Sequence, residues 1–176
     1  LDKCSKFVVP NGVKVDIIDR KKSDYNLKLK GYPCLITVGS ITDRKGQINL
    51  IKSLPEIITH FPKVHYHCVG LPIEKDNLLE YVQQLDLQKY ITLHGFVPNS
   101  KLFEIYKQAD ILIMLSQNNS LFNVEGFGIV VLEANLFGIP AIGSKMTGIE
   151  DAILHNETGK LVDPYSPKEI LDGIID

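Results

Sequence analysis

The chain has 176 residues, of which 44% are hydrophobic, so it can bury one sizeable core and a single domain is the default expectation. Its formal net charge of -2 argues against nucleic acid or an anionic membrane surface as a partner of the whole molecule. No signal peptide opens the chain, and no apolar run is long enough to cross a bilayer.

The cysteines and the chain ends indicate the compartment and the extent of the protein. Cys4, Cys34 and Cys68 are odd in number and far apart, which predicts buried thiols in a reducing compartment, not a disulfide frame or a zinc site. The chain starts at Leu1 instead of a methionine and stops inside a helical pattern. We therefore expect it to be a piece of a longer protein.

Short apolar runs alternate along the chain with stretches of helical period. Strands are expected at 6–10, 33–39, 64–70, 91–95, 111–115, 140–144 and 160–162, and helices at 45–61, 74–85, 102–109, 127–137, from about 148 and from Ser166. Pro55 should kink the helix over 45–61 or begin a second helix there. Asn99 and Ser100 can cap the helix over 102–109, and the polar segment 16–31 reads as a surface excursion.

These strand runs have few polar positions, as a parallel sheet covered on both faces requires. Their regular alternation with helices predicts an α/β fold, a Rossmann-like doubly wound parallel sheet with right-handed crossovers. Ligands of such sheets bind beyond the carboxyl ends of the strands. The loops to search for a site are therefore 39–46, 70–73, 95–99, 116–126 and 144–148.

The loop GSITDRKG (39–46) follows a strand and enters a helix. Gly39 and Gly46 allow tight turning, while Arg44 and Lys45 put two cations beside a helix N-terminus. Cations there oppose the helix dipole unless an anion is bound, which suggests a phosphate site. A solvated basic turn explains the spacing about equally well. The loop is not a Walker A loop, because G-x-x-x-x-G-K-[ST] is absent.

The loop SQNNSLFNVEGFG (116–128) is long and rich in amides. Gly126 and Gly128 can present backbone N–H groups to phosphate or sugar oxygens at the start of the next helix. Glu125 falls just before that helix, and Glu133 lies about two turns inside it, on the same face as position 126, so it can point toward the ligand crevice. A sugar- or nucleotide-binding role competes evenly with carboxylates at a helix end or in solvent. The segment is not a dinucleotide fingerprint, because valine stands at 131.

Other motifs have simpler structural explanations. Thr147-Gly148-Ile149-Glu150 forms a capping box, for which a role as helix N-cap is sufficient. His65 and His67 share one face of a strand, but no carboxylate is near in sequence, so a structural role is favoured over a metal site. The sequence has no D-x-D pair and no G-x-S-x-G elbow.

Taken together, the chain resembles the C-terminal, donor-binding half of GT-B glycosyltransferases of the family 4 type, nearly end to end. The matching segments are VVPNGV (8–13), LITVGSITDRKGQINLIKSLPEI (35–57), ITLHGFV (91–97), ADILIMLS (109–116), VEGFGIVVLEANLFGIPAIGS (124–144) and HNETGKLVDP (155–164). The E-x7-E motif from Glu125 to Glu133 is the most specific of these. The RKGQ and VEGFGIVVLEA segments are most similar to bacterial mannosyltransferases of the phosphatidylinositol mannoside kind.

The resemblance implies roles for individual residues. Glu125 would lie against the donor sugar hydroxyls, Glu133 would accept hydrogen bonds from the ribose, and Lys45 would bind the diphosphate. The backbone of Gly126, Phe127 and Gly128 would help to hold sugar and phosphate, and Gly95, Phe96 and Val97 would line the base.

Two positions depart from the family pattern. The family arginine falls at Ser40 here, with Gly39 before it, so Arg44 is the candidate replacement on the diphosphate. The family's G-G-x-P-E loop reads Thr147 to Asp151 in this chain, which weakens the correspondence there.

The resemblance implies a nucleotide-sugar-binding domain, spanning 1–176, of a metal-independent, retaining glycosyltransferase that uses no cofactor. The donor would be GDP- or UDP-linked, and a glycan or lipid-linked acceptor would bind an N-terminal domain outside this chain. We expect a cytoplasmic enzyme, held peripherally at the inner membrane face through that domain. The alternatives are a nucleotide-sugar 2-epimerase of the same architecture and a degenerate sugar-nucleotide-binding scaffold, motivated by Ser40.

Overall fold

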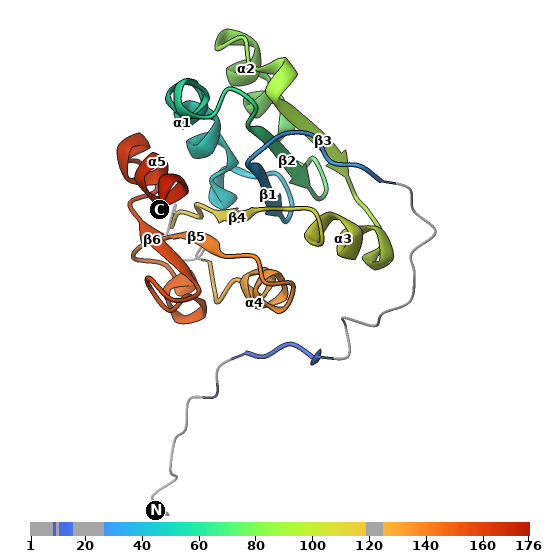
Figure 1. Ribbon diagram of the computed structural model, residues 1–176, viewed down its shortest axis with the longest axis vertical. Coiled ribbons are helices and arrows are strands. Elements are labelled where there is room, and N and C mark those ends of the chain that lie inside the picture. The colour runs from blue at the N-terminus through green and yellow to red at the C-terminus, as the bar shows by residue number, and fades with distance from the viewer. Residues whose placement is uncertain (1–8, 10, 16–26, 119–124) are drawn as a thin grey trace, which may run out of the picture.

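The computed structural model describes Val9, residues 11–15, residues 27–118 and residues 125–176. A six-stranded sheet, parallel throughout, forms its centre, with strand order β3-β2-β1-β4-β5-β6 (Figure 1). The strands are β1 (Cys34–Val38), β2 (His65–Val69), β3 (Ile91–Gly95), β4 (Ile111–Met114), β5 (Ala141–Ser144) and β6 (Gly159–Val162). This confirms the predicted doubly wound sheet. The further strand predicted at 6–10 lies outside the described residues apart from Val9.

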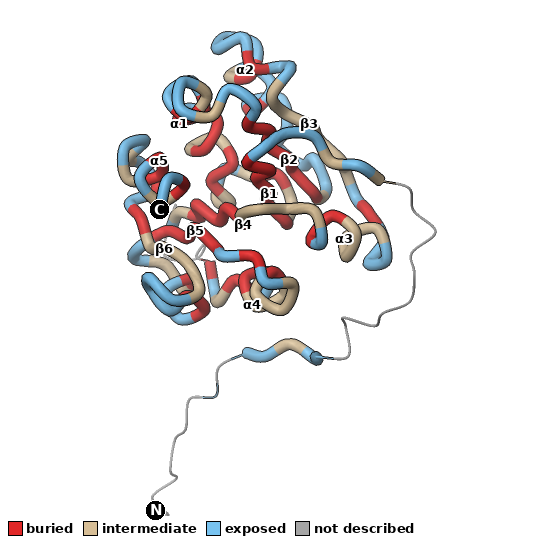
Figure 2. Tube along the Cα trace, viewed as in Figure 1, coloured by how far each residue is buried: buried red, intermediate tan, exposed pale blue. Residues whose placement is uncertain are grey.

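Helices cover both faces of the sheet, which is why its strands are apolar on both sides (Figure 2). One face packs on residues of α1, α2 and α5, and the other packs on residues of α3, α4 and the turn η4. The bounds are α1 (Gln47–His60), α2 (Lys75–Gln84), α3 (Asn99–Tyr106), α4 (Ile129–Leu136), α5 (Pro167–Ile175), and the 3-10 turns η2 (Asp43–Lys45), η3 (Gln88–Tyr90) and η4 (Gly148–Ala152).

Helix α1 continues through Pro55, so the prediction of a second helix starting there was wrong. The proline removes a donor to the carbonyl of Ile51, but it lies on the exposed side of the helix. The opposite side is anchored by Leu50, Leu54 and Ile57, which are fully buried. Burial of that stripe outweighs the lost hydrogen bond.

Three predictions of local structure also need correction. Helix α3 begins at Asn99 itself, and its cap residue, Pro98, makes no side-chain capping bond, so the capping role of Asn99 and Ser100 was wrong. Residues 27–31 are not a pure surface excursion, because Leu27 and Leu29 pack on the core and hydrogen-bond to Gln108. Helix α4 starts at Ile129, two residues later than predicted.

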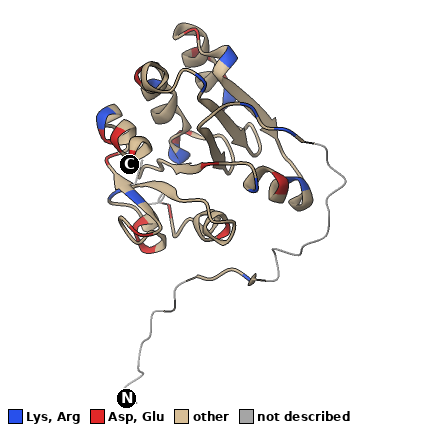
Figure 3. Cartoon of the chain, in the orientation of Figure 1, with Lys and Arg blue, Asp and Glu red and all other residues tan. Residues whose placement is uncertain are grey.

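Other predictions hold. Thr147 caps η4 through its hydroxyl, which accepts from the Ile149 N–H at 3.3 Å, although the reciprocal bond of Glu150 goes to the Met146 N–H. Cys34 and Cys68 are free and buried. Acidic and basic residues are interspersed over the elements, in keeping with the small net charge (Figure 3). Within the described ranges, no helix combines the length and the apolar character needed to cross a membrane.

Candidate functional site

The candidate site lies where the chain order of the sheet reverses. From β1 the chain proceeds outward to β2 and β3, and it then crosses back to place β4 on the other side of β1. In open α/β sheets the loops on the two sides of such a point leave neighbouring strands in opposite directions, and ligands bind in the crevice between them. This is the standard ligand position in an open α/β sheet.

Close backbone contacts fix these two loops against each other. Gly46 adopts φ +69°, and a Cβ added to it would lie 1.7 Å from the carbonyl oxygen of Leu115, so no other residue fits. Gln117 donates its backbone N–H to the Arg44 carbonyl at 2.8 Å and its side-chain Nε2 to the Asp43 carbonyl at 2.7 Å. The turn that carries the two predicted cations is thus rigidly attached to the loop after β4.

Both cations meet the first glutamate of the E-x7-E motif. Arg44 Nη1 lies 2.5 Å from Glu125 Oε2, and Lys45 Nζ lies 2.7 Å from the same oxygen. Ser116 donates its hydroxyl to that oxygen as well, at 3.2 Å. Burial raises the pKa of Glu125, but Lys45 and Arg44 outweigh it and hold the pKa below its ordinary value. From the sequence, a phosphate site and a solvated basic turn explained these cations about equally well, and in the structure both cations pair with a carboxylate of the chain itself.

The segment after Glu125 offers unpaired backbone donors. The N–H groups of Gly126, Phe127 and Gly128 find no hydrogen-bond acceptor among the described residues. Gly126 has open space where a Cβ would stand, and Gly128 caps α4 with φ +70°. Free amides ahead of a helix N-terminus suit phosphate or sugar oxygens.

Buried polar atoms without partners gather at the loop after β1. Within the described part of the chain, the buried side-chain atoms that lack a hydrogen-bond partner are Thr42 Oγ1, Gln47 Oε1 and Asn49 Nδ2. Gln47 donates its Nε2 to the Ser40 carbonyl at 3.0 Å. Unpaired buried polar groups are costly, and they concentrate where ligands or waters bind.

Glu133 does not join the charged cluster in this structure. Its Oε2 accepts a hydrogen bond from the Tyr106 hydroxyl of α3 at 3.0 Å. Because α4 begins at Ile129, position 126 is outside the helix, and the argument that 126 and 133 share a helical face was wrong. Burial raises the pKa of Tyr106, and the neighbouring Glu133 raises it further. Sequence reasoning missed Tyr106, since nothing in its spacing links α3 to α4.

A row of glycines continues the crevice along the other half of the sheet. Gly39, Gly70 and Gly95 end β1, β2 and β3 with positive φ angles of 146°, 149° and 65°. Gly39 donates its N–H to the Val69 carbonyl at 2.8 Å, and Gly70 donates to the Gly95 carbonyl at 2.9 Å. A Cβ on Gly70 would lie 2.1 Å from the Gly39 carbonyl oxygen. The three glycines form a floor without side chains at the ends of these strands. The sequence prediction named Gly39 and Gly95 as site residues but not Gly70.

At the end of that floor, the two residues after Gly95 differ in their exposure to solvent. Phe96 is 75% exposed, whereas Val97 is buried in the core. The phenyl ring of Phe96 therefore lies at the surface, next to Gly95 at the end of this floor. It offers a flat apolar surface at the place assigned to the base.

The histidines of β2 form a buried row with a histidine of β3. His65 Nε2 bonds the Thr92 hydroxyl at 2.8 Å, and His67 bonds His94 at 2.9 Å and the Lys30 carbonyl at 3.1 Å. Burial, as the largest cause, lowers the pKa of both His65 and His94 to about 4. Within the described residues, no group of three His, Cys, Asp or Glu side chains is placed to hold a metal ion. The hydrogen bonds to Thr92, His94 and the Lys30 carbonyl give these histidines partners within the fold.

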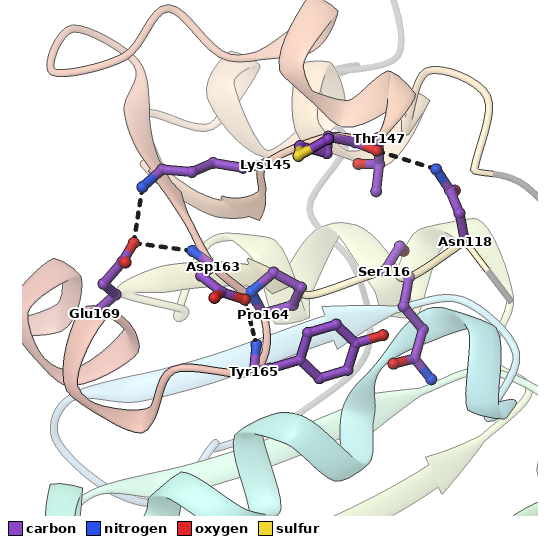
Figure 4. A pocket seen from close by; sticks show the side chains of 10 residues that line it. Ser116, Asn118, Lys145, Thr147, Asp163, Pro164, Tyr165 and Glu169 are labelled. Carbon is purple, nitrogen blue, oxygen red and sulfur yellow. Dashed lines mark hydrogen bonds and ion pairs between the residues drawn. The ribbon is translucent and has the colours of Figure 1, made fainter.

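A cavity of about 600 Å³ opens beyond the ends of β4, β5 and β6 (Figure 4). On one side, Lys145 pairs with Glu169 at 2.8 Å. On the other, Asn118 donates to the Met146 carbonyl at 3.0 Å. The cavity adjoins the charged cluster through Ser116, which lines it and also bonds Glu125. Sequence reasoning named the loop at 144–148 but missed the contribution of the loop after β6.

A doubly wound parallel sheet with cations at its switch point and a polar cavity beside them places the chain among the α/β domains that bind ligands at the carboxyl ends of their strands. The family model described as "Glycosyl transferases group 1" matches residues 19–176, and the chain belongs to that family.

Curated relatives agree with this assignment. The chain is 28% identical over 143 residues to the GDP-mannose-dependent alpha-(1-6)-phosphatidylinositol monomannoside mannosyltransferase of Mycobacterium tuberculosis, covering 81% of this chain and 37% of that protein. It is 32% identical over 141 residues to the uncharacterized glycosyltransferase MJ1607 of Methanocaldococcus jannaschii, covering 80% of this chain and 34% of that protein. The chain thus spans about a third of the length of these relatives.

Two solved structures share the fold. The structure of Anabaena Alr3699/HepE in complex with UDP-glucose matches with a TM-score of 0.70 at 25% identity, over 82% of this chain and 39% of that one. The C-terminal domain of LpcC from Francisella tularensis matches with a TM-score of 0.73 at 24% identity, over 93% of this chain and 86% of that one.

Proposed function

We propose that this chain is the donor-binding domain of a glycosyltransferase and that it binds a nucleotide-diphospho-sugar in the crevice between β1 and β4. The observation that carries the proposal is the convergence of Arg44 and Lys45 on one anion at 2.5 and 2.7 Å. A pair of partly buried cations at the switch point of a parallel sheet suits a diphosphate.

The rest of the crevice suits the remaining parts of such a donor. The free amides of Gly126, Phe127 and Gly128 would hold sugar and phosphate oxygens. The floor that ends at Gly95 would carry the nucleoside, with Phe96 and Val97 beside the base. Glu133 would accept hydrogen bonds from the ribose, and Glu125 from the sugar. The relatives support GDP and the Anabaena structure supports UDP as the donor's nucleotide.

Chemistry at this site would depend on charge. Breaking the bond between the sugar and the diphosphate leaves negative charge on the phosphate oxygens. Lys45 and Arg44, already in place beside those oxygens, would stabilise that charge without reorganising. Retention at the sugar and independence from a metal ion and from any cofactor belong to the same proposal. The acceptor, a glycan or a lipid-linked sugar, would bind through the part of the enzyme that lies outside this chain.

Titration calorimetry of the chain tests the proposal with GDP-mannose, UDP-glucose, GDP and UDP. We expect at least one donor to bind and Lys45→Ala to weaken its binding by about a hundredfold, because a charge-assisted contact to the diphosphate is lost. Lys168→Ala is the matched control, since Lys168 is exposed on α5 and pairs with Asp172, away from the crevice.

The two alternative functions, a scaffold and a 2-epimerase, predict different results in these experiments. Failure of every nucleotide to bind would favour a scaffold that has lost the site. Donor binding together with epimerisation and no transfer by the full-length enzyme would favour the 2-epimerase.

A further inference from the structure

Glu125 occupies the position of an anion between two cations. Its Oε2 receives Arg44 Nη1 at 2.5 Å, Lys45 Nζ at 2.7 Å and Ser116 Oγ at 3.2 Å. Its Oε1 has no hydrogen-bond partner among the residues that the structure describes. Three donors that converge on one oxygen form the arrangement that a phosphate oxygen also requires.

The backbone turn that carries the two cations is held in place. Their backbone turn ends at Gly46, which is locked against Leu115, and Gln117 bonds the Arg44 carbonyl. The side chains of Arg44 and Lys45 are 25% and 16% exposed. Partly buried cations are costly to leave without a counter-charge, so an anion between them is favoured.

The carboxylate is the partner that can leave. The backbone of Glu125 is held to η4, because its carbonyl accepts the Gly148 N–H at 3.2 Å. Its flexible side chain can turn away while the backbone stays in place. A diphosphate that reaches Lys45 competes for the same donors and repels the carboxylate, since both are negative.

We propose that Glu125 is an internal stand-in for the donor diphosphate, and that donor binding exchanges one anion for the other. This inference rests on the proposed function. The displaced carboxylate needs new hydrogen-bond donors, and the hydroxyls of an attached sugar supply them. A free nucleoside diphosphate brings no such donors and leaves the carboxylate unpaired beside it.

This exchange makes Glu125 a specificity-determining residue. It favours the sugar-bearing nucleotide over the free nucleoside diphosphate, which is also the product of transfer. After transfer the sugar hydroxyls are gone, and Glu125 competes for Arg44 and Lys45 again. Return of the carboxylate thus promotes release of the product.

Calorimetry on the wild-type chain and on Glu125→Gln tests the exchange, with UDP, GDP, inorganic pyrophosphate, UDP-glucose and GDP-mannose as ligands. We expect UDP or GDP and pyrophosphate to bind about tenfold more tightly to Glu125→Gln, because the competing anion is removed. The affinity for the sugar-bearing nucleotide should rise less than threefold, because the substitution also removes the carboxylate that accepts hydrogen bonds from the sugar hydroxyls.

Two further variants serve as controls for this interpretation. Glu74→Gln is the matched control. Glu74 is exposed and accepts a hydrogen bond at 2.6 Å from the N–H of Asp43, which lies on the same loop as the two cations. Its neutralisation therefore changes the local charge without removing a partner of Arg44 or Lys45. Glu125→Asp keeps the charge but shortens its reach, and it should tighten pyrophosphate binding to an intermediate extent. Circular dichroism and thermal unfolding verify that each variant folds.

The outcomes separate this inference from the proposed function. If the wild-type chain binds the sugar nucleotide, but Glu125→Gln and Glu125→Asp bind UDP, GDP and pyrophosphate no better than wild type, the exchange is refuted and the donor site stands. Equal tightening by Glu74→Gln refutes the exchange too. If no nucleotide binds, yet pyrophosphate binds Glu125→Gln more tightly than wild type, the donor function falls and the anion exchange stands. No binding of any ligand to any variant refutes both.

Discussion

Glu125 and Glu133 stand eight residues apart in one motif, yet the fold gives them opposite surroundings. Glu125 precedes α4 and meets two cations from the loop after β1. Glu133 lies within α4 and accepts one neutral hydrogen bond from Tyr106. The difference shows that a carboxylate's partners are decided by the elements packed beside it, not by its place in a motif. One glutamate is balanced by charge, and the other is held by a single hydroxyl.

The largest effect should come from breaking the turn that brings the cations to Glu125. Gly46→Ala places a methyl group 1.7 Å from the Leu115 carbonyl oxygen and puts a non-glycine residue at φ +69°. We expect a loss of about 3 kcal/mol or more in the free energy of unfolding, measured by urea denaturation. Gly138→Ala is the control, since it has φ +76° but open space around the added Cβ, and it should cost about 1 kcal/mol. Equal losses in the two variants would mean that the contact with Leu115 is unimportant.

The second prediction tests whether Glu133 has a ligand role beyond its bond to Tyr106. If it accepts hydrogen bonds from the ribose, Glu133→Ala should weaken nucleotide binding by about ten- to a hundredfold, as measured by calorimetry. Pyrophosphate lacks a ribose, so its affinity should stay the same. An unchanged affinity for the nucleotide would remove Glu133 from the donor site and leave it as a partner of Tyr106 alone.

The third prediction concerns pH, because the pKa of Glu125 is lowered by Lys45 and Arg44 after burial has raised it. A carboxyl with a lowered folded pKa contributes stability above its ordinary pKa, and this contribution is lost as the pH falls through the folded value. Glu125→Gln should therefore be less stable than wild type by about 2 kcal/mol at pH 7, and the two should converge in acid. Urea denaturation at pH 7 and in acid measures this difference in the free energy of unfolding. A difference that persists in strong acid would show that the loss is not electrostatic.

Fold class followed from the sequence because apolar strands and amphipathic helices are local patterns, and tertiary packing reinforced them. The loop with Arg44 and Lys45 could be picked out as a candidate, since cations beside a helix N-terminus conflict with the helix dipole, but a solvated turn explained it about equally well. Their pairing with Glu125 was not predictable from spacing, because 80 residues separate Lys45 from it. The same holds for Gly70 and for Tyr106, whose positions matter only once strands and helices are side by side. The second helix predicted as one alternative at Pro55 does not form, because a buried stripe outweighs a local preference.

The smallest effect should come from the hydroxyl that holds Glu133. Tyr106 is only 1% exposed, and its ring stacks on Phe137 with centroids 5.3 Å apart, so Tyr106→Phe keeps the packing and removes one donor. Because Glu133 is half-buried, water can replace that donor, and we expect a loss of about 1 kcal/mol in the free energy of unfolding. Tyr106→Phe also leaves Glu133 free to turn toward a ribose, so nucleotide affinity should be unchanged or slightly higher. A marked fall in affinity would mean that Tyr106 positions Glu133 for the ligand and does not compete with it.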